Sequence, residues 1–266
     1  MNDVVRWARL LNCRGSSSWR VLICVCVALF GLPTHDLTMA AGSADDRFAV
    51  LVFSRTAGYR HDSIPAGIAA IRGLGLQHRF AVDATEGPEI FSDDALAKYR
   101  AIVFLNTTGT ILNAEQHAAF ERFIRRGGGF VGIHSASDTE YKWPWYGKLV
   151  GAYFRSHPAI QPAALKVTEP SHPSTTHLPR TWTRTDEWYN FRNPPGAEVT
   201  LLVRIDESSY QGGTMGADHP MTWCHSYDGG RAWYTALGHT IESYSDPVFL
   251  QHVWGGIAWS ASMPFE

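Results

Sequence analysis

The apolar residues of the N-terminal half form short runs that alternate with amphipathic segments. Strands are predicted at residues 48–53, 77–82, 101–105 and 130–133. Helices are predicted between them, at residues 64–74, at 93–97 and from 113 onward. The strand at 130–133 has no polar alternation, as in a strand that is covered on both faces. Strands that alternate with helices predict a doubly wound parallel sheet between layers of helices.

Two of these helices are preceded by residues that favour a helix N-terminus. Asp62 or Ser63 is predicted to cap the first one, with Pro65 in its first turn. Asn113 stands three positions before Gln116, which is the spacing of a capping box. These signals predict where the two helices begin.

The stretch from Gly127 to Ser135 combines a glycine turn, the strand at 130–133 and a polar residue, His134, at the end of that strand. In an open α/β sheet, ligands bind beyond the carboxyl ends of the strands. His134 is therefore predicted to lie where such a fold keeps its chemistry.

The C-terminal half is richer in proline and in β-forming segments. A polar loop at 135–140 and an aromatic-rich helix at 143–150 lead into it. Strands are then predicted at residues 164–167, 198–205, 221–224 and 231–234, followed by a last helix at 247–259. No low-complexity linker separates the two halves, so residues 45–266 are predicted to form one domain.

The first 44 residues have the pattern of an export signal. Arginines at positions 6, 9, 14 and 20 precede an apolar run at 21–32, and small residues follow at 40–44. The run is shorter than the ~20 apolar residues that a membrane-spanning helix needs. We therefore predict a signal peptide, or alternatively an uncleaved N-terminal anchor, and a domain exported to the periplasm or secreted.

Charge and cysteine content narrow the set of partners and cross-links. With 23 basic and 25 acidic residues the net charge is −2, so no nucleic acid is predicted as a partner, and a membrane only if the N-terminal segment is uncleaved. Three of the four cysteines lie in that segment, so Cys224 cannot form an internal disulfide in the predicted mature chain. Ten Trp and ten Tyr suit a core, and such rings also suit the C–H faces of sugars.

Four polar clusters carry the candidate chemistry, at residues 59–62, 134–138, 185–189 and 238–239. From them, His61, His134, Glu187 and His239 are predicted to be catalytic, because imidazole titrates near pH 7 and moves protons. The same four could instead hold a divalent metal, zinc or manganese, with one position open for water or a substrate oxygen. They could also be structural histidines at strand ends. His157, beside Pro158, is predicted to serve a loop.

Several common active-site motifs are absent from the sequence. No G-x-S-x-G elbow is present, and no sequence-local metal signature such as H-E-x-x-H. Neither glycine-rich phosphate-binding motif occurs, so no nucleotide cofactor is predicted.

Several long motifs, in order along the chain, resemble the ThuA-like, or trehalose utilization, family. The matching stretches are 56–61, 127–134, 156–158, 185–191, 218–223 and 231–239, followed by Tyr244 and 255–259. The resemblance implies a class I glutamine amidotransferase-like fold. This is a flavodoxin-like three-layer α/β/α sandwich with a mostly parallel sheet, here with β-rich additions in the C-terminal half. In the amidotransferases the elbow after the fourth strand carries a nucleophilic cysteine. Here His134 takes that place, so cysteine-dependent glutamine hydrolysis is not expected.

The resemblance further implies a role in the use of disaccharides such as trehalose, through oxidised keto-sugars. The leading hypothesis is an exported sugar-processing hydrolase, lyase or isomerase whose partner is a small-molecule sugar. Candidates for binding that sugar are Arg55, Tyr59, Arg60, Asp138, Trp188 and Tyr244. The alternative is a non-catalytic periplasmic carbohydrate-binding or sensing protein on the same scaffold. A cysteine-independent amidohydrolase is a third hypothesis.

Overall fold

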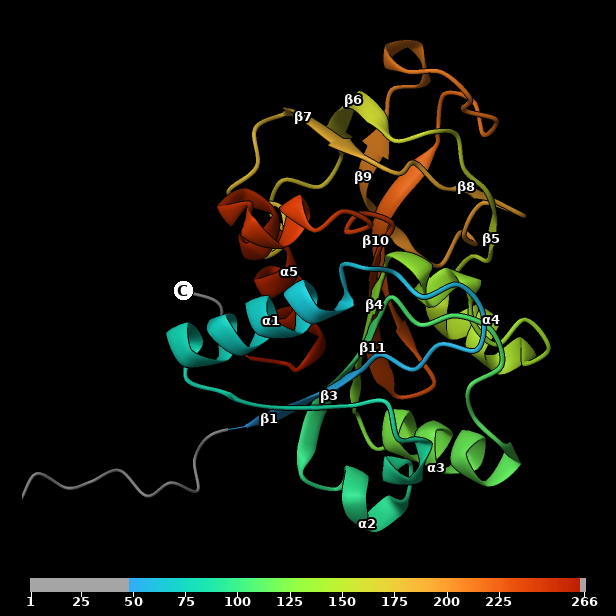
Figure 1. The fold of residues 1–266 in the computed structure, drawn as a ribbon, viewed down its shortest axis with the longest axis vertical. Helices are drawn as coiled ribbons and strands as arrows, with labels where there is room; N and C mark the ends of the chain where they lie inside the picture. Colours follow the sequence, from blue (N-terminus) through green and yellow to red (C-terminus); the bar gives the residue numbers. More distant parts are fainter. Residues whose placement is uncertain (1–47, 264–266) are drawn as a thin grey trace, which may run out of the picture. The chain divides into compact units, whose positions relative to one another are not determined.

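A nine-stranded mixed sheet forms the centre of the computed structural model, which describes residues 48–263 (Figure 1). The strands of this sheet are β1 (Ala49–Phe53), β2 (Ala81–Thr85), β3 (Tyr99–Leu105), β4 (Gly129–Ile133), β6 (Gln161–Val167), β7 (Thr181–Asp186), β9 (Thr200–Ile205), β10 (Pro220–Tyr227) and β11 (Gly230–Thr235). Their order is β2-β1-β3-β4-β11-β10-β9-β6-β7. Two further strands, β5 (Phe154–Ser156) and β8 (Asn190–Phe191), pair separately.

The first five strands of that order are parallel to one another. The order β2-β1-β3-β4-β11 is the flavodoxin-like order 2-1-3-4-5, with the last strand of the chain in the fifth place. β4 is buried along its whole length, as its unbroken apolar run predicts. The predicted α/β fold class is confirmed.

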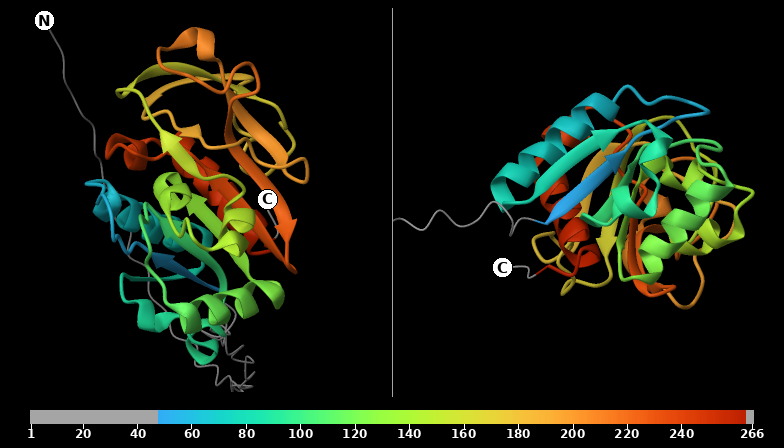
Figure 2. Two further views of the ribbon diagram at one scale, coloured as in Figure 1. Left: turned by 90° about the vertical axis from the view of Figure 1, so that its right-hand side faces the viewer. Right: turned by 90° about the horizontal axis from the view of Figure 1, so that it is seen from below.

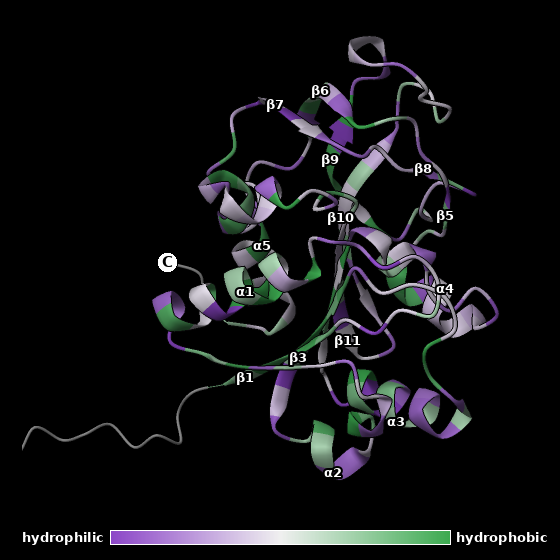
Figure 3. Ribbon diagram, viewed as in Figure 1, coloured by the Kyte–Doolittle hydropathy of each residue, from purple (hydrophilic) through white to green (hydrophobic). Residues whose placement is uncertain are grey.

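Helices cover both faces of the parallel strands. They are α1 (Ile64–His78), α2 (Asp93–Leu96), α3 (Ala114–Arg125), α4 (Pro144–Val150) and α5 (Pro247–Ser260), with short 3-10 turns η1 (Pro88–Ile90), η2 (His134–Asp138), η3 (Glu207–Ser209) and η4 (Glu242–Ser245). α1 and α5 lie on one face, and α3 and α4 on the other (Figures 1 and 2). The hydrophobic residues of β1 and β3 lie between these layers (Figure 3). None of the helices in residues 48–263 is long and apolar enough to cross a membrane.

The other four strands of the sheet are antiparallel to their neighbours and extend it beyond β11. In Figure 1, β6, β7 and β9 lie above the parallel strands, on the side where those strands end. This β-rich addition confirms the prediction for the C-terminal half. Its edge strand, β7, ends at Asp186, immediately before the candidate residue Glu187.

The prediction for the second strand is wrong at its start. Residues 77 and 78 belong to the last turn of α1, and β2 begins at Ala81. Arg79 ends the helix in the left-handed conformation, and its N–H donates to the Gly75 carbonyl. Phe80 then packs between Phe48 and Trp254. The turn between helix and strand is so short that the polar residues of the helix end look like part of the strand.

One predicted helix cap is confirmed and the other has a different role. Asn113 and Gln116 form both hydrogen bonds of a capping box. Ser63 occupies the N-cap position of α1, but its side chain makes no capping bond. Its hydroxyl instead accepts a hydrogen bond of 2.9 Å from the Asn106 side chain, which follows β3. The hydroxyl therefore joins the loops after two parallel strands.

Strands β5, β7 and β8 were not predicted, because their sequences carry no run of apolar residues. β7, for example, exposes Thr181, Thr183 and Thr185 and buries Trp182 and Asp186. The predicted signal peptide or anchor, residues 1–44, lies outside the described residues.

We expect His252, on the buried face of α5, to make folding sensitive to acid. Its Nδ1 lies 2.6 Å from the Ser174 carbonyl, and burial lowers its pKa from 6.5 to about 3. Between those values the unfolded chain binds more protons, so the stability present above pH 6.5 is lost as the pH falls toward 3. His252→Asn keeps an N–H for Ser174 but has no group that titrates in this range. Between pH 3 and pH 6.5, the slope of its free energy of unfolding against pH should therefore be smaller than that of the wild type by about 1.4 kcal/mol per pH unit. Urea titrations at several pH values measure the difference, and parallel curves would contradict it.

Candidate functional site

His134 lies at a sharp elbow between β4 and η2. Its φ is +50°, a conformation that non-glycine residues adopt rarely and that is frequent at functional sites. The elbow is fixed by Tyr234, whose hydroxyl donates to the His134 carbonyl at 2.8 Å. His134 Nδ1 lies 2.7 Å from the Ala236 carbonyl, so this nitrogen carries the hydrogen and donates it. The other ring nitrogen, Nε2, faces the cluster and lies 3.1 Å from His239 Nδ1.

His239 is presented by the turn that follows β11. Gly238 has a φ of +104°, and a Cβ there would lie 2.9 Å from the Tyr244 hydroxyl, so both backbone and space favour glycine. The Tyr244 hydroxyl donates to the Gly238 carbonyl at 3.0 Å. Because β4 and β11 are adjacent strands, with Ile133 opposite Thr235, the turns that carry His134 and His239 start side by side.

Asp186 fixes the position of this turn against the end of β7. Its buried carboxylate accepts hydrogen bonds from the backbone N–H groups of Gly238 (2.9 Å) and His239 (3.1 Å). It also accepts one from the N–H of Glu187 (3.0 Å), and the Arg184 guanidinium lies 3.3 Å away. One carboxylate therefore sets both Glu187 and His239. Asp186 is not among the residues predicted to form the site, although it lies inside the polar cluster at 185–189.

His61 comes from the loop after β1. This loop is held to the loop after β3 by two hydrogen bonds of Thr108, which accepts from the Gly58 N–H and donates to the Tyr59 carbonyl. His61 is buried, and its Nδ1 lies 3.4 Å from the Ser135 hydroxyl. The histidine is thus fixed both through its backbone and through its ring.

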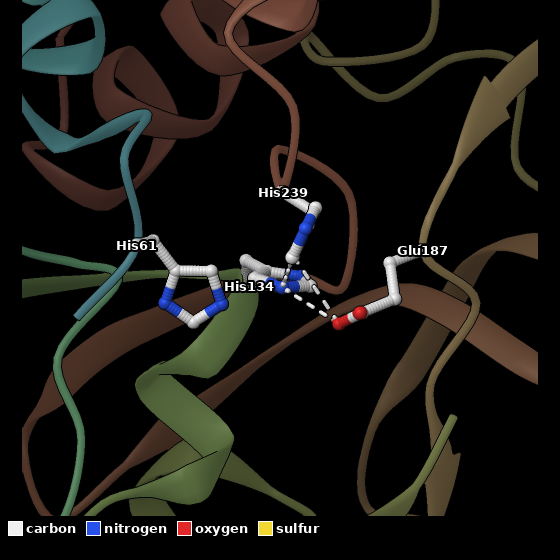
Figure 4. A group of neighbouring side chains, drawn as sticks. All are labelled: His61, His134, Glu187 and His239. Atoms are coloured by element: carbon white, nitrogen blue, oxygen red, sulfur yellow. Dashed lines mark hydrogen bonds and ion pairs between the residues drawn. The ribbon is translucent and has the colours of Figure 1, made fainter. Parts of the chain in front are cut away.

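These four side chains converge on one point. One ligand atom from each of His61, His134, Glu187 and His239 lies within 4.8 Å of the others. Glu187 Oε2 is 3.4 Å from His134 Nε2 and 3.2 Å from His239 Nδ1, and these two nitrogens are 3.1 Å apart. Figure 4 shows His61 and Glu187 on opposite sides of His134. The structure therefore brings together all four predicted residues, and their catalytic roles stay predictions.

The electrostatics of the cluster favour a positive charge at its centre. Burial alone would raise the pKa of Glu187, but hydrogen bonds from His134 and His239 outweigh it and hold the carboxyl well below its ordinary value. For His239, burial opposes protonation, but Glu187 and the Asp186 charge outweigh burial and raise the pKa. Burial, together with the neighbouring histidines, lowers the pKa of His61 to about 2, so this ring is neutral at pH 7.

The donor set fits a metal ion. Neutral imidazole nitrogens and a carboxylate oxygen are metal ligands, and the hydrogen bond from His134 Nδ1 to a backbone carbonyl is a typical support for a ligating histidine. The separations of 3.1–3.4 Å are close to the edge of a tetrahedron with metal–ligand bonds of ~2.0–2.1 Å, about 3.3–3.4 Å. The four residues could therefore hold a metal.

A cavity of about 390 Å³ opens over this cluster. It is lined by Tyr59, His61, Asp138, Phe154, His157, Glu187, Tyr189 and His239. Its volume lies in the range of ~300–1,000 Å³ that small-molecule sites have, and it combines aromatic walls with a few polar groups. The cavity places the cluster within reach of a small ligand.

A sequence model described as "ThuA: Trehalose utilisation" matches residues 49–260, nearly all of the described chain. The chain belongs to the ThuA family. Two solved ThuA-like proteins have the same fold. The one from Bacteroides uniformis has a TM-score of 0.69 at 23% identity, with 80% of this chain and 91% of that chain covered. The one from Parabacteroides merdae has a TM-score of 0.68 at 20% identity, with 81% and 90% covered. No curated protein matches the chain.

Of the six residues predicted to bind the sugar, the structure brings two to the cavity of this ThuA domain, Tyr59 and Asp138. Trp188 is fully buried and donates from its indole N–H to the Gln161 carbonyl. Tyr244 is buried behind Gly238. Arg60 pairs with Glu86 at 2.7 Å, and neither it nor Arg55 lines the cavity.

Three residues that line the ThuA cavity were not predicted to belong to the site: Phe154, His157 and Tyr189. His157 was predicted to serve a loop, but its Nδ1 lies 3.0 Å from Glu187 Oε1 and its ring lines the cavity. Tyr189 packs against the His134 ring at 4.1 Å between centroids. The motif 185–191 contains Tyr189, so its position two residues after Glu187 was the available signal.

Cys224 lies within β10 and does not line the cavity. Burial raises the pKa of its thiol to about 12, so it is protonated at neutral pH. The residue at the elbow after β4 in this ThuA chain is His134, and the absence of cysteine-dependent glutamine hydrolysis stays a prediction.

Replacement of Asp186 tests whether this carboxylate positions the cluster. In Asp186→Asn an N–H₂ group takes the place of one oxygen and faces backbone N–H groups, so the turn carrying His239 should shift. We expect zinc affinity, measured by competition with a chelating dye, to fall 10- to 100-fold, as for other residues that orient metal ligands. Asp206→Asn, in which the aspartate pairs with Lys166 away from the site, is the matched control. Equal affinity of the two variants would contradict the role.

Proposed function

We propose that this ThuA protein is an exported sugar-processing enzyme that acts on a disaccharide or keto-sugar with the help of a bound divalent metal. The observation that carries the proposal is the convergence of three imidazoles and one carboxylate within 4.8 Å, at the base of a cavity. Buried polar groups gathered in this way around a concave site are typical of catalytic centres. The family description, trehalose utilisation, supports a sugar as the substrate.

Zinc or manganese is the proposed ion. Three imidazoles favour zinc, and the carboxylate is a ligand that both ions accept. His61, which is neutral at pH 7, requires no loss of a proton before binding, whereas His239, with its raised pKa, releases one. Affinity for the ion should therefore increase with pH. When bound, such an ion polarises a carbonyl oxygen or activates a water molecule.

The cavity walls suit a sugar. The rings of Tyr59, Phe154 and Tyr189 offer faces for C–H groups, and Asp138 and His157 offer partners for hydroxyls. Asp138 is anchored by the Tyr141 hydroxyl at 2.5 Å, which fixes the direction of its free lone pairs. These groups would orient the ring so that its reacting carbon faces His134 and Glu187.

Proton transfer in this site would use residues at the cavity wall. His157 is 42% exposed at its side chain and contacts Glu187, so it can pass protons between the site and solvent. The His157 Nδ1 lies 3.0 Å from Glu187 Oε1, so the ring and the carboxylate stand in direct contact at the cavity wall. The chain therefore contains an acid/base pair next to the proposed ion.

The proposal is tested by metal content and by turnover. Elemental analysis of the purified protein should find about one zinc or manganese ion per chain, and the protein should convert a keto-disaccharide such as keto-trehalose. His134→Ala and Glu187→Ala should each lose the ion, and their turnover should fall at least 100-fold, in line with the contribution of general acid–base groups. Glu115→Ala, on the exposed side of α3, is the control.

Full turnover by His134→Ala and Glu187→Ala would rule out the assignment. Sugar binding with no product after long incubation would instead support the carbohydrate-binding or sensing alternative. Release of ammonia from glutamine would support the amidohydrolase. Export is tested by the N-terminal sequence of the protein recovered from the periplasm or medium, which should begin near residue 45.

A further inference from the structure

A second, smaller pocket adjoins the cavity of the candidate site. Its volume is about 210 Å³. It shares two lining residues with the larger cavity, Tyr59 and His239, so the two hollows meet along these side chains. Its other lining residues include Asp62, Ile160, Thr240, Ile241 and Glu242. Apart from Tyr59 and His239, no residue that lines this pocket has a part in the function proposed above.

Exposed apolar side chains gather around this second pocket. Five large hydrophobic residues are exposed in residues 48–263, and three of them, Tyr59 (65%), Ile160 (48%) and Ile241 (51%), line the pocket. Single exposed apolar residues need no explanation, but a group of them around a hollow indicates a binding surface. These three side chains therefore offer a surface on which the apolar face of a ligand can pack.

The polar groups of the pocket add a hydrogen-bonding function. Asp62 and Glu242 are exposed carboxylates, and Thr240 contributes a hydroxyl. Carboxylates accept hydrogen bonds from hydroxyl groups, and apolar side chains cover C–H faces. A sugar ring presents both kinds of surface, whereas a hydrocarbon or a flat aromatic ligand would leave the two carboxylates without partners.

The backbone beneath the pocket is ordered before any ligand arrives. The Thr240 hydroxyl accepts from the N–H of Ser243 at 3.2 Å and bonds to its hydroxyl at 3.0 Å. The Tyr244 N–H donates to the Ile241 carbonyl at 3.1 Å. These bonds hold Ile241 and Glu242 at the start of η4, so binding there needs little ordering of the chain.

We infer that the pocket formed by Tyr59, Ile160, Ile241 and Glu242 is a second sugar subsite, which binds the non-reacting ring of a disaccharide. This inference rests on the proposed function. The reacting ring lies in the larger cavity over His134 and Glu187, and the glycosidic bond crosses the boundary formed by Tyr59 and His239. The second ring would pack on Ile160 and Ile241 and donate hydroxyl hydrogen bonds to Asp62 and Glu242. The enzyme would therefore distinguish disaccharides from monosaccharides.

Calorimetry with the zinc-loaded protein tests the subsite. The probes are trehalose, maltose and cellobiose, each compared with glucose. At least one disaccharide should bind about 10-fold more tightly than glucose, which corresponds to about 1.4 kcal/mol. In Ile241→Glu this preference should disappear while the affinity for glucose stays the same. Glu242→Gln, a conservative change, should weaken the preference several-fold. Leu76→Glu, at the exposed leucine of α1, is the matched control and should keep it.

Each result distinguishes the subsite from the proposed function. Equal affinity for glucose and every disaccharide would overturn the subsite. So would a loss of the disaccharide preference in Leu76→Glu as large as in Ile241→Glu. A change of oligomeric state in Ile241→Glu with unchanged sugar binding would also overturn it. Turnover without a disaccharide preference would remove the subsite and leave the enzyme. A disaccharide preference without any turnover would keep the subsite and contradict the enzyme. Absence of binding by all the sugars would overturn the subsite outright.

Discussion

The site depends on the buried carboxylate of Asp186. It sits at the end of an edge strand, β7, and binds the backbone of a turn 52 residues further on, at Gly238 and His239. The Arg184 guanidinium offsets its charge, and the backbone N–H groups satisfy its oxygens, so its burial is compensated. Without this contact, nothing local to residues 185–187 would direct Glu187 toward histidines carried by the parallel strands.

Local pattern was enough for the parallel half of the fold. The unbroken apolar run of β4 and the glycine turn before it correctly indicate a buried strand that delivers His134 at its carboxyl end. The meeting of His61, His134 and His239 follows from one rule, that parallel strands end at the same edge. The place of Glu187 does not follow from that rule, since it comes from the antiparallel addition. It was indicated only by the polar cluster at 185–189 and by the family motif at 185–191.

Two residues, Trp188 and His157, lie in positions that the local sequence pattern did not predict. Trp188 directly follows Glu187, yet its indole is buried in the core while the Glu187 carboxylate lines the cavity. His157 reaches Glu187 because β5 pairs with β8, which lies just after Glu187 in the chain. That pairing involves three residues on one side and two on the other, too few for a hydrophobic period to show. The ion pair between His157 and Glu187 therefore depends on the fold and cannot be read from the local sequence.

The four converging side chains come from two structurally different parts of the sheet. Three stand on turns that follow parallel strands, and Glu187 stands on the antiparallel addition. An ion held by all four would act as a clasp between them, since neither part could move away without breaking a coordinate bond. Binding of the ion would then stabilise the contact between the parallel strands and the antiparallel addition, and its loss would loosen that contact.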